Sequence, residues 1–204
     1  KLTVLAALPA GVGLSVLAEP ILLLLYPAVP DTARAAAYHL TFLGLACVFV
    51  CLMVAANGVL QAYGHPLVPV LALLCGGVLK VVTNYLMVGD PATGIRGAAV
   101  STLYCYALIV LIDLIAIARL VPERPGYIRL FARPVLVTAV MALAARSGYG
   151  LFCRVLPERW AVLPAIAVAA AVYGILALAT GAVTRTDVVT LPRGEKIADF
   201  LHLR

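Results

Sequence analysis

Four polar or charged side chains stand inside long apolar stretches of this sequence: Glu19, Lys80, Asn84 and Asp113. A charged side chain at the centre of a membrane-spanning helix costs about 2.5–3.5 kcal/mol, so such groups usually face a protein interior or a water-filled path. Their presence in apolar segments therefore favours a transport route, and we take all four as candidates for a substrate cavity.

Lys80 and Asn84 are four residues apart, so they share one face of a helix. A lysine on a cavity wall would meet an anionic headgroup or a carboxylate of a substrate. The alternatives are a structural ion pair, or a side chain that extends toward the nearer membrane surface. The shared face favours the interpretation in which both residues point inward.

Asp113 is a candidate proton or cation site, although we favour the interpretation in which it makes a hydrogen bond between helices. Direct pairing with Lys80 on the preceding helix also stays open. Glu19 precedes Pro20, whose ring frees a backbone carbonyl and allows a kink. Glu19 is either a cavity carboxylate or a group near the outer interface.

Other polar residues indicate structure rather than chemistry. Asn57 and Gln61 are also four residues apart, and we interpret them as ties between helix ends. The histidines are scattered singly, and the five cysteines form no CxxC pair. With no Ser/His/Asp set, HExxH motif or Walker loop, the sequence predicts no enzyme, no metal site and no cofactor.

The composition defines the class of protein. The chain is 64% hydrophobic and 12% charged, with a mean hydropathy of +1.09. Soluble domains are nearer about 45–50% apolar and about 25% charged. The sequence therefore predicts an integral membrane protein in contact with membrane lipids. The net charge of +6 fits the positive-inside rule, and the basic residues form no patch for nucleic acid.

Apolar segments of about 20 residues, long enough to span a membrane, recur along the chain. They predict an all-α fold with six transmembrane helices at 2–26, 35–62, 67–88, 97–120, 134–152 and 160–183. The connections are short and rich in Pro and Gly, so consecutive helices should be antiparallel neighbours. Because the chain opens at Lys1, directly before an apolar helix, we expect it to be trimmed or part of a longer protein.

Lys and Arg are unequally divided between the two ends of the predicted helices. One end holds Lys1, Arg119, Arg124, Arg129, Arg133, Arg185, Arg193, Lys196 and Arg204, and the other holds Arg34, Arg96, Arg146, Arg154 and Arg159. Loops on the cytoplasmic side carry the excess of Lys and Arg. Both ends of the chain are therefore predicted to be cytoplasmic.

Several short motifs resemble a known family when taken in order. They are LPAGVGLSVLAEPI at 8–21, LQAYGHP at 60–66, Lys80 with Asn84, GIRGAA at 94–99 and LPRGEK at 191–196. Together they resemble polysaccharide transporters of the multidrug/oligosaccharidyl-lipid/polysaccharide flippase superfamily, in the branch of stage V sporulation protein B. Lipid II flippases are related to this branch. Asp113 stands where its members often have Asn.

The resemblance implies the last six helices of a 14-helix flippase in the bacterial cytoplasmic membrane. Residues 1–120 would be four helices of the C-terminal lobe, 121–133 a basic cytoplasmic loop, 134–183 the final helix pair and 184–204 a cytoplasmic tail. The substrate would be a saccharide linked to a polyprenyl pyrophosphate, such as lipid II or a polysaccharide unit. A missing N-terminal lobe of the same protein would complete the cavity.

Two further functions stay open at the sequence level. A drug/cation antiporter of the same superfamily would couple Asp113 or Glu19 to H⁺ or Na⁺, although such antiporters generally lack the final helix pair. A membrane scaffold or subunit without transport of its own is the second alternative.

Overall fold

The computed structural model describes residues 1–90, 93–122 and 126–181, and every regular element in these ranges is a helix. The helices are α1 (Leu2–Val16), α2 (Ala18–Leu25), α3 (Pro30–Ala62), α4 (Leu67–Val88), α5 (Arg96–Leu120), α6 (Tyr127–Phe152) and α7 (Val162–Ala179). The predicted all-α class is confirmed.

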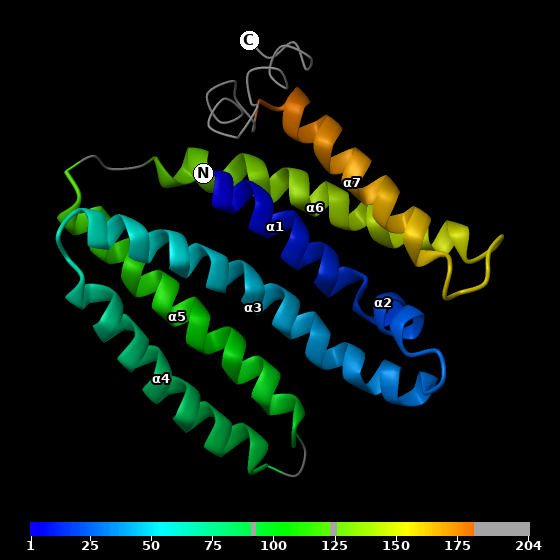
Figure 1. The fold of residues 1–204 in the computed structure, drawn as a ribbon, viewed down its shortest axis with the longest axis horizontal. Coiled ribbons are helices and arrows are strands. Elements are labelled where there is room, and N and C mark those ends of the chain that lie inside the picture. The colour runs from blue at the N-terminus through cyan, green and yellow to red at the C-terminus, as the bar shows by residue number, and fades with distance from the viewer. Residues whose placement is uncertain (91–92, 123–125, 182–204) are drawn as a thin grey trace.

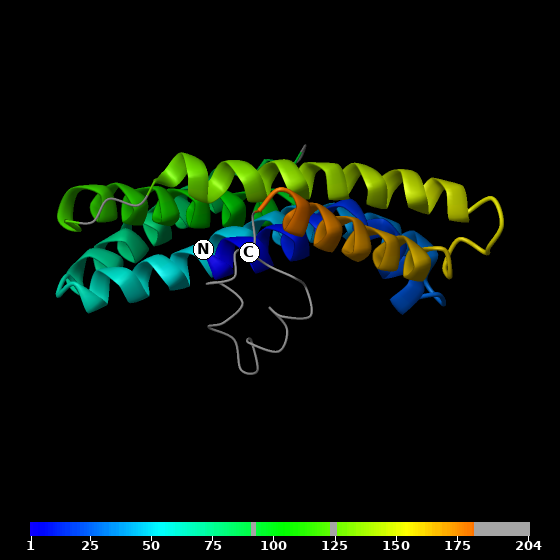
Figure 2. The same cartoon turned by 90° about the horizontal axis from the view of Figure 1, so that it is seen from above.

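The long helices lie side by side in the spatial order α4, α5, α3, α1, α6 and α7 (Figure 1). Only neighbours in this series share extensive contacts, and α2 packs on α3 near the start of that helix. Figure 2 shows the same helices from above, as an elongated bundle rather than a closed ring. Helices α4 and α7 therefore lie on opposite edges of the bundle.

Five helices are long and apolar enough to cross a membrane: α3, α4, α5, α6 and α7. Helices α1 and α2 count as a sixth span if the bent pair is taken as one segment, with an angle of 72° between them. The chain is thus a multi-pass membrane protein, in agreement with the six predicted segments.

The break between α1 and α2 follows from Pro20. Proline has no backbone N–H, and its ring clashes with the carbonyl four residues earlier, which here belongs to Val16. The chain leaves helical geometry at Leu17, with φ −101° and ψ 20°, and α2 then begins at Ala18. The kink allowed by the sequence is present as a sharp break.

Helix boundaries agree with the prediction where Pro or Gly ends an apolar run. Helix α4 occupies the predicted range, whereas α6 begins at Tyr127 and carries Pro134 inside it. The basic loop predicted over 121–133 is therefore shorter, because membrane helices tolerate an internal proline. The predicted tail at 184–204 and Arg124 lie outside the described residues.

Glycines set the closest helix contacts. A Cβ built on Gly11 of α1 would lie 2.6 Å from the carbonyl oxygen of Gly44 on α3. On α4, a Cβ at Gly76 would lie 2.4 Å from Cγ1 of Ile109 on α5. Small residues let membrane helices approach closely enough for van der Waals packing to hold them together.

The starts of α3, α5 and α7 and the ends of α2, α4 and α6 lie at one end of the bundle (Figure 1). The distribution of Lys and Arg predicts that this end is outside the cytoplasm, and we call it the predicted outer end. The Arg96 guanidinium at the start of α5 lies 5.3 Å from the centre of the Tyr38 ring in the first turns of α3. The two helix starts thus meet at this end, and its extracytoplasmic location stays a prediction.

Candidate functional site

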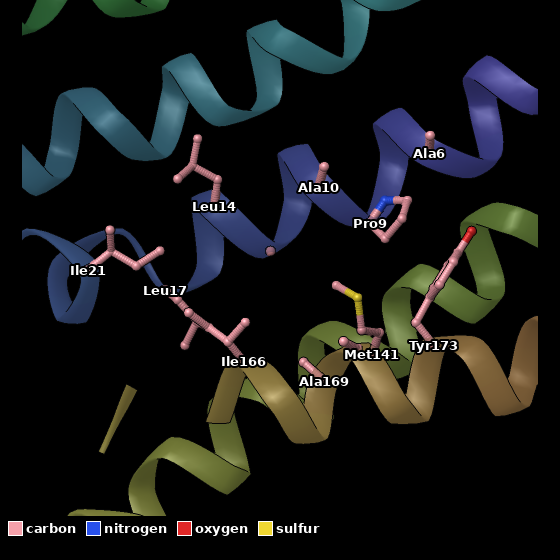
Figure 3. A pocket seen from close by; sticks show the side chains of 12 residues that line it. Ala6, Pro9, Ala10, Leu14, Leu17, Ile21, Met141, Ile166, Ala169 and Tyr173 are labelled. Atoms are coloured by element: carbon pink, nitrogen blue, oxygen red, sulfur yellow. The ribbon is translucent and has the colours of Figure 1, made fainter. Parts of the chain in front are cut away.

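An apolar groove lies between α1 and the pair formed by α6 and α7. It encloses about 430 Å³ and continues past the helix break to Ile21 of α2. Figure 3 shows side chains from both sides extending into this space, among them Pro9, Met141 and Tyr173. We call this space the apolar groove.

Small residues of α1 form one wall of the apolar groove, with Ala6, Ala10 and Gly13 along it. Tyr173 of α7 supplies a hydroxyl there, and that hydroxyl donates a hydrogen bond of 2.7 Å to the backbone carbonyl of Leu5. Because this polar group is satisfied within the protein, the groove presents an almost wholly apolar surface to a ligand.

A second pocket of about 480 Å³ adjoins the same helix break. Helices α1, α2, α3 and α6 line it, and most of its side chains are polar. The lining residues are Ser15, Val16, Ala18, Glu19, Arg34, Ala37, Tyr38, Thr41 and Arg146. We call this space the polar pocket.

Glu19 lies on the wall of the polar pocket, close to the predicted outer end. Its Oε1 atom is 3.5 Å from Nε of Arg34, and its side chain is half exposed. Arg34 also approaches Glu158 at 3.8 Å and Asp31 at 3.9 Å. Arg34 therefore joins α2, α3 and the connection between α6 and α7, and carboxylates compensate its charge.

Asp113 is fully buried between α5 and α3. With the amide of Asn57 in the orientation that satisfies both groups, its Nδ2 donates to Oδ2 of Asp113 at 3.1 Å and to the Met53 carbonyl at 3.2 Å. Oδ1 of Asp113 has no hydrogen-bond partner. The pairing with Lys80 that the sequence left open is absent, and Asn57 connects two helices in the bundle interior.

Asn84 and Lys80 lie along the face of α4 that packs on α5. Ser101 Oγ of α5 donates a hydrogen bond of 2.5 Å to Oδ1 of Asn84, and Ser101 is fully buried. Lys80 is half-buried beside the Cys105 thiol of α5. Among the described residues, the side-chain ammonium of Lys80 makes no hydrogen bond or ion pair, so its charge lacks a partner there.

The candidate residues occupy three separate places rather than one site. Lys80 and Asn84 lie at the contact of α4 with α5, Asp113 at the contact of α5 with α3, and Glu19 at the helix break. Gln61 is exposed in the last turn of α3, where its backbone carbonyl accepts a bond from Gly64 N–H at 3.0 Å.

Comparisons with known proteins provide a second line of information. The first 86 residues match the MatE family model. An uncharacterized membrane protein of Bacillus subtilis (strain 168), YabM, is 26% identical over 209 residues that cover 100% of this chain. The chain spans 38% of the length of that relative. No solved structure matches the chain.

The MatE match covers α1, α2, α3 and most of α4. It thus includes the helix break with Glu19 and the polar face with Lys80 and Asn84, and it ends before Asp113. This similarity agrees with the superfamily indicated by the sequence motifs, and the narrower branch stays a prediction.

Sequence reasoning missed the residues whose role depends on neighbouring helices. Ser101 and Tyr173 are two of these residues, since neither belongs to a sequence pattern that would single it out. Arg146 carried a usable signal, because it is a charged residue inside the apolar segment that became α6.

Proposed function

We propose that this chain is part of a flippase that moves a saccharide linked to a polyprenyl pyrophosphate, such as lipid II or a polysaccharide unit, across the bacterial cytoplasmic membrane. The observation that carries the proposal is the apolar groove between α1, α6 and α7. The likeness to MatE over residues 1–86 supports a transporter. Transport would proceed by alternating access, as two lobes rock about a central site.

The groove is suited to a lipid tail for a physical reason. Membrane lipids are as apolar as the protein surface, so shape and van der Waals contact rather than the hydrophobic effect hold a lipid chain in place. The small side chains of α1 leave room for such a chain, and the side chains of α7 provide a wall. A polyprenyl tail could thus remain in the groove while its headgroup moves.

Lys80 is our candidate for contact with the anionic headgroup, with Asn84 shaping the same face. Helix α4 lies at the edge of the bundle, and several of its large apolar side chains are more than half exposed, among them Leu71, Leu74, Val78 and Tyr85. We propose that an N-terminal lobe of the same protein covers part of this edge. On the Lys and Arg distribution, both ends of the chain would face the cytoplasm.

The groove can be tested by filling it. Ala170→Trp places a large ring in the groove, and we expect it to slow flipping by about tenfold, a barrier increase of about 1.4 kcal/mol. Ala167→Trp, an exposed alanine on the same helix outside the groove lining, is the matched control. The measurement is flipping of a fluorescent polyprenyl-linked saccharide by the full-length protein in vesicles. Equal rates for both variants would contradict the proposal.

The headgroup role of Lys80 has its own test. We expect Lys80→Ala to lower the flipping rate in the same assay by about tenfold, because a charge-assisted contact of about 1.5–3 kcal/mol is removed. Lys80→Arg, which keeps the charge, should retain most of the activity. An unchanged rate for Lys80→Ala would remove this residue from the mechanism while leaving the groove proposal intact.

One observation favours a second candidate function, a cation-coupled multidrug antiporter. Asp113 is fully buried in a membrane helix and has one carboxyl oxygen without a partner. Ionisable groups in such positions often mark proton or ion pathways. Transport that requires an H⁺ or Na⁺ gradient and stops in Asp113→Asn would favour the antiporter, and flipping without any gradient would favour the flippase.

A further inference from the structure

Arg146 is the basic group of the polar pocket whose charge is not compensated. It lies in the apolar segment of α6 that is long enough to span a membrane, and its side chain lines the pocket. Within the ranges that the structure describes, it makes no hydrogen bond and no ion pair. Arg34, the second arginine of the pocket, is paired with Glu19 at 3.5 Å and with Glu158 at 3.8 Å.

The Arg146 side chain is exposed on the pocket wall, so its guanidinium is accessible to an anionic partner. Even near the end of a membrane helix, an unpaired arginine is costly, and it is usually directed toward water, another charge or a lipid headgroup. Its planar fork of donors fits a phosphate with two parallel hydrogen bonds. Phosphate is therefore the ligand chemistry that Arg146 fits best.

The polar pocket and the apolar groove share their walls. On α6, Met141 lines the groove and Arg146 lines the pocket. At the helix break, Leu17 lines the groove, whereas its neighbours Val16 and Ala18 line the pocket. The two spaces thus adjoin across the helix break, with the polar pocket toward the predicted outer end of the bundle.

The other groups around the pocket leave Arg146 as the main contact for a phosphate. The Thr41 hydroxyl donates to the Ala37 carbonyl at 2.9 Å, so its proton is not available to a phosphate oxygen. Arg96 lies over the ring of Tyr38, which lines the pocket, and adds positive potential from α5. Glu19 is the acidic group in the lining, and its contact with Arg34 offsets its own repulsion of a phosphate.

We propose that the polar pocket binds the phosphate-bearing headgroup of a lipid, with Arg146 as the main contact and the lipid chain in the apolar groove. The proposal rests on the proposed function only in taking the groove as a lipid site. It concerns binding at the helix break, so a binding measurement tests it separately from flipping.

Native mass spectrometry of the full-length protein can measure this binding. The ligands are undecaprenyl phosphate, phosphatidic acid and inorganic phosphate, each titrated into the protein in detergent. We expect Arg146→Gln to weaken binding of the two phosphate-bearing lipids by about tenfold, which corresponds to about 1.4 kcal/mol. Arg159→Gln is the matched control, because Arg159 is exposed at the same end, lies over the Trp160 ring and does not line the pocket.

A variant with the opposite expected effect strengthens the test. Glu19→Gln removes a carboxylate from the pocket and leaves Arg34 with two carboxylate neighbours instead of three, so we expect lipid binding to tighten by severalfold. If Arg146→Gln is unstable, it would lose lipid binding because it does not fold. The two single variants Glu19→Gln and Arg146→Lys would then test the proposal. Arg146→Lys keeps the charge and should retain part of the affinity.

Three results would overturn the proposal. The first is equal lipid binding by Arg146→Gln and the unmodified protein. The second is an equal loss in Arg146→Gln and Arg159→Gln, which would indicate general attraction between charges. The third is binding of inorganic phosphate as tight as that of either lipid, which would assign the pocket to a free anion. If one of these results is obtained while the unmodified protein still flips the saccharide lipid, this inference is rejected and the proposed function stands.

Discussion

Gly11→Ala is expected to destabilise the protein by about 1–3 kcal/mol, although it adds a single methyl group. The new Cβ would lie 2.4 Å from Cγ2 of Val48 and 2.6 Å from the carbonyl oxygen of Gly44. The second of these atoms belongs to the backbone of α3 and cannot turn aside. Helix α1 would have to move away from α3 and would carry the walls of both pockets with it.

Gly13→Ala is the matched control on the same helix. Its Cβ would meet only the terminal methyl group of Met141, at an ordinary contact distance of 3.7 Å. Since alanine favours helix by about 1 kcal/mol over glycine, we expect equal or higher stability. Thermal unfolding of both variants in detergent is the measurement, and equal melting temperatures would mean that α1 and α3 do not cross at Gly11.

Asn57→Leu is the second variant with a large expected effect. It would remove the hydrogen-bond partner of Asp113, whose carboxyl group is fully buried and already has one unpaired oxygen. A buried polar group that loses its partner costs about 1–3 kcal/mol, and more if it is charged. We therefore expect a marked loss of stability without any loss of apolar packing.

The double variant Asn57→Leu/Asp113→Leu should recover most of that loss. Replacing both members of a buried polar pair by apolar groups is often neutral or stabilising, whereas removing one member is not. Gln61→Leu, one turn further along α3 and exposed, serves as the control and should change little. If the double variant were as unstable as the single one, the contact between Asn57 and Asp113 would not be the cause.

These variants also bear on function, because Asp113 distinguishes the two candidate transporters. A purely structural aspartate can be replaced together with its partner while flipping continues. An aspartate that carries a coupling ion cannot be replaced in this way, whatever the stability of the double variant. Stability and transport should therefore be measured on the same set of proteins.

The sequence by itself determined the features that depend on local chemistry. Apolar runs of membrane-spanning length predicted the six segments, because the length of a span depends on the thickness of the bilayer alone. The break near Pro20 followed from the missing N–H of that residue, and the limits of α4 from the turn residues on either side of it.

The tertiary structure alone decided which groups meet. Spacing placed Lys80 and Asn84 on one face of a helix, but it did not indicate that Ser101 on α5 would satisfy Asn84. It also left Asp113 between three interpretations, and the packing of α5 on α3 brought Asn57 to it. A helical repeat defines faces within one helix, whereas the neighbour opposite each face depends on how all the helices pack.

The two pockets at the helix break also combine residues visible in the sequence with contacts that only the packing of the helices decided. The residues that line them come from segments far apart in sequence, as Leu17 and Met141 do in the apolar groove and Glu19 and Arg146 do in the polar pocket. Each residue was visible in the sequence as an apolar or charged side chain in a membrane segment. Their convergence was not, since contacts between distant segments arise only when the helices fold against one another.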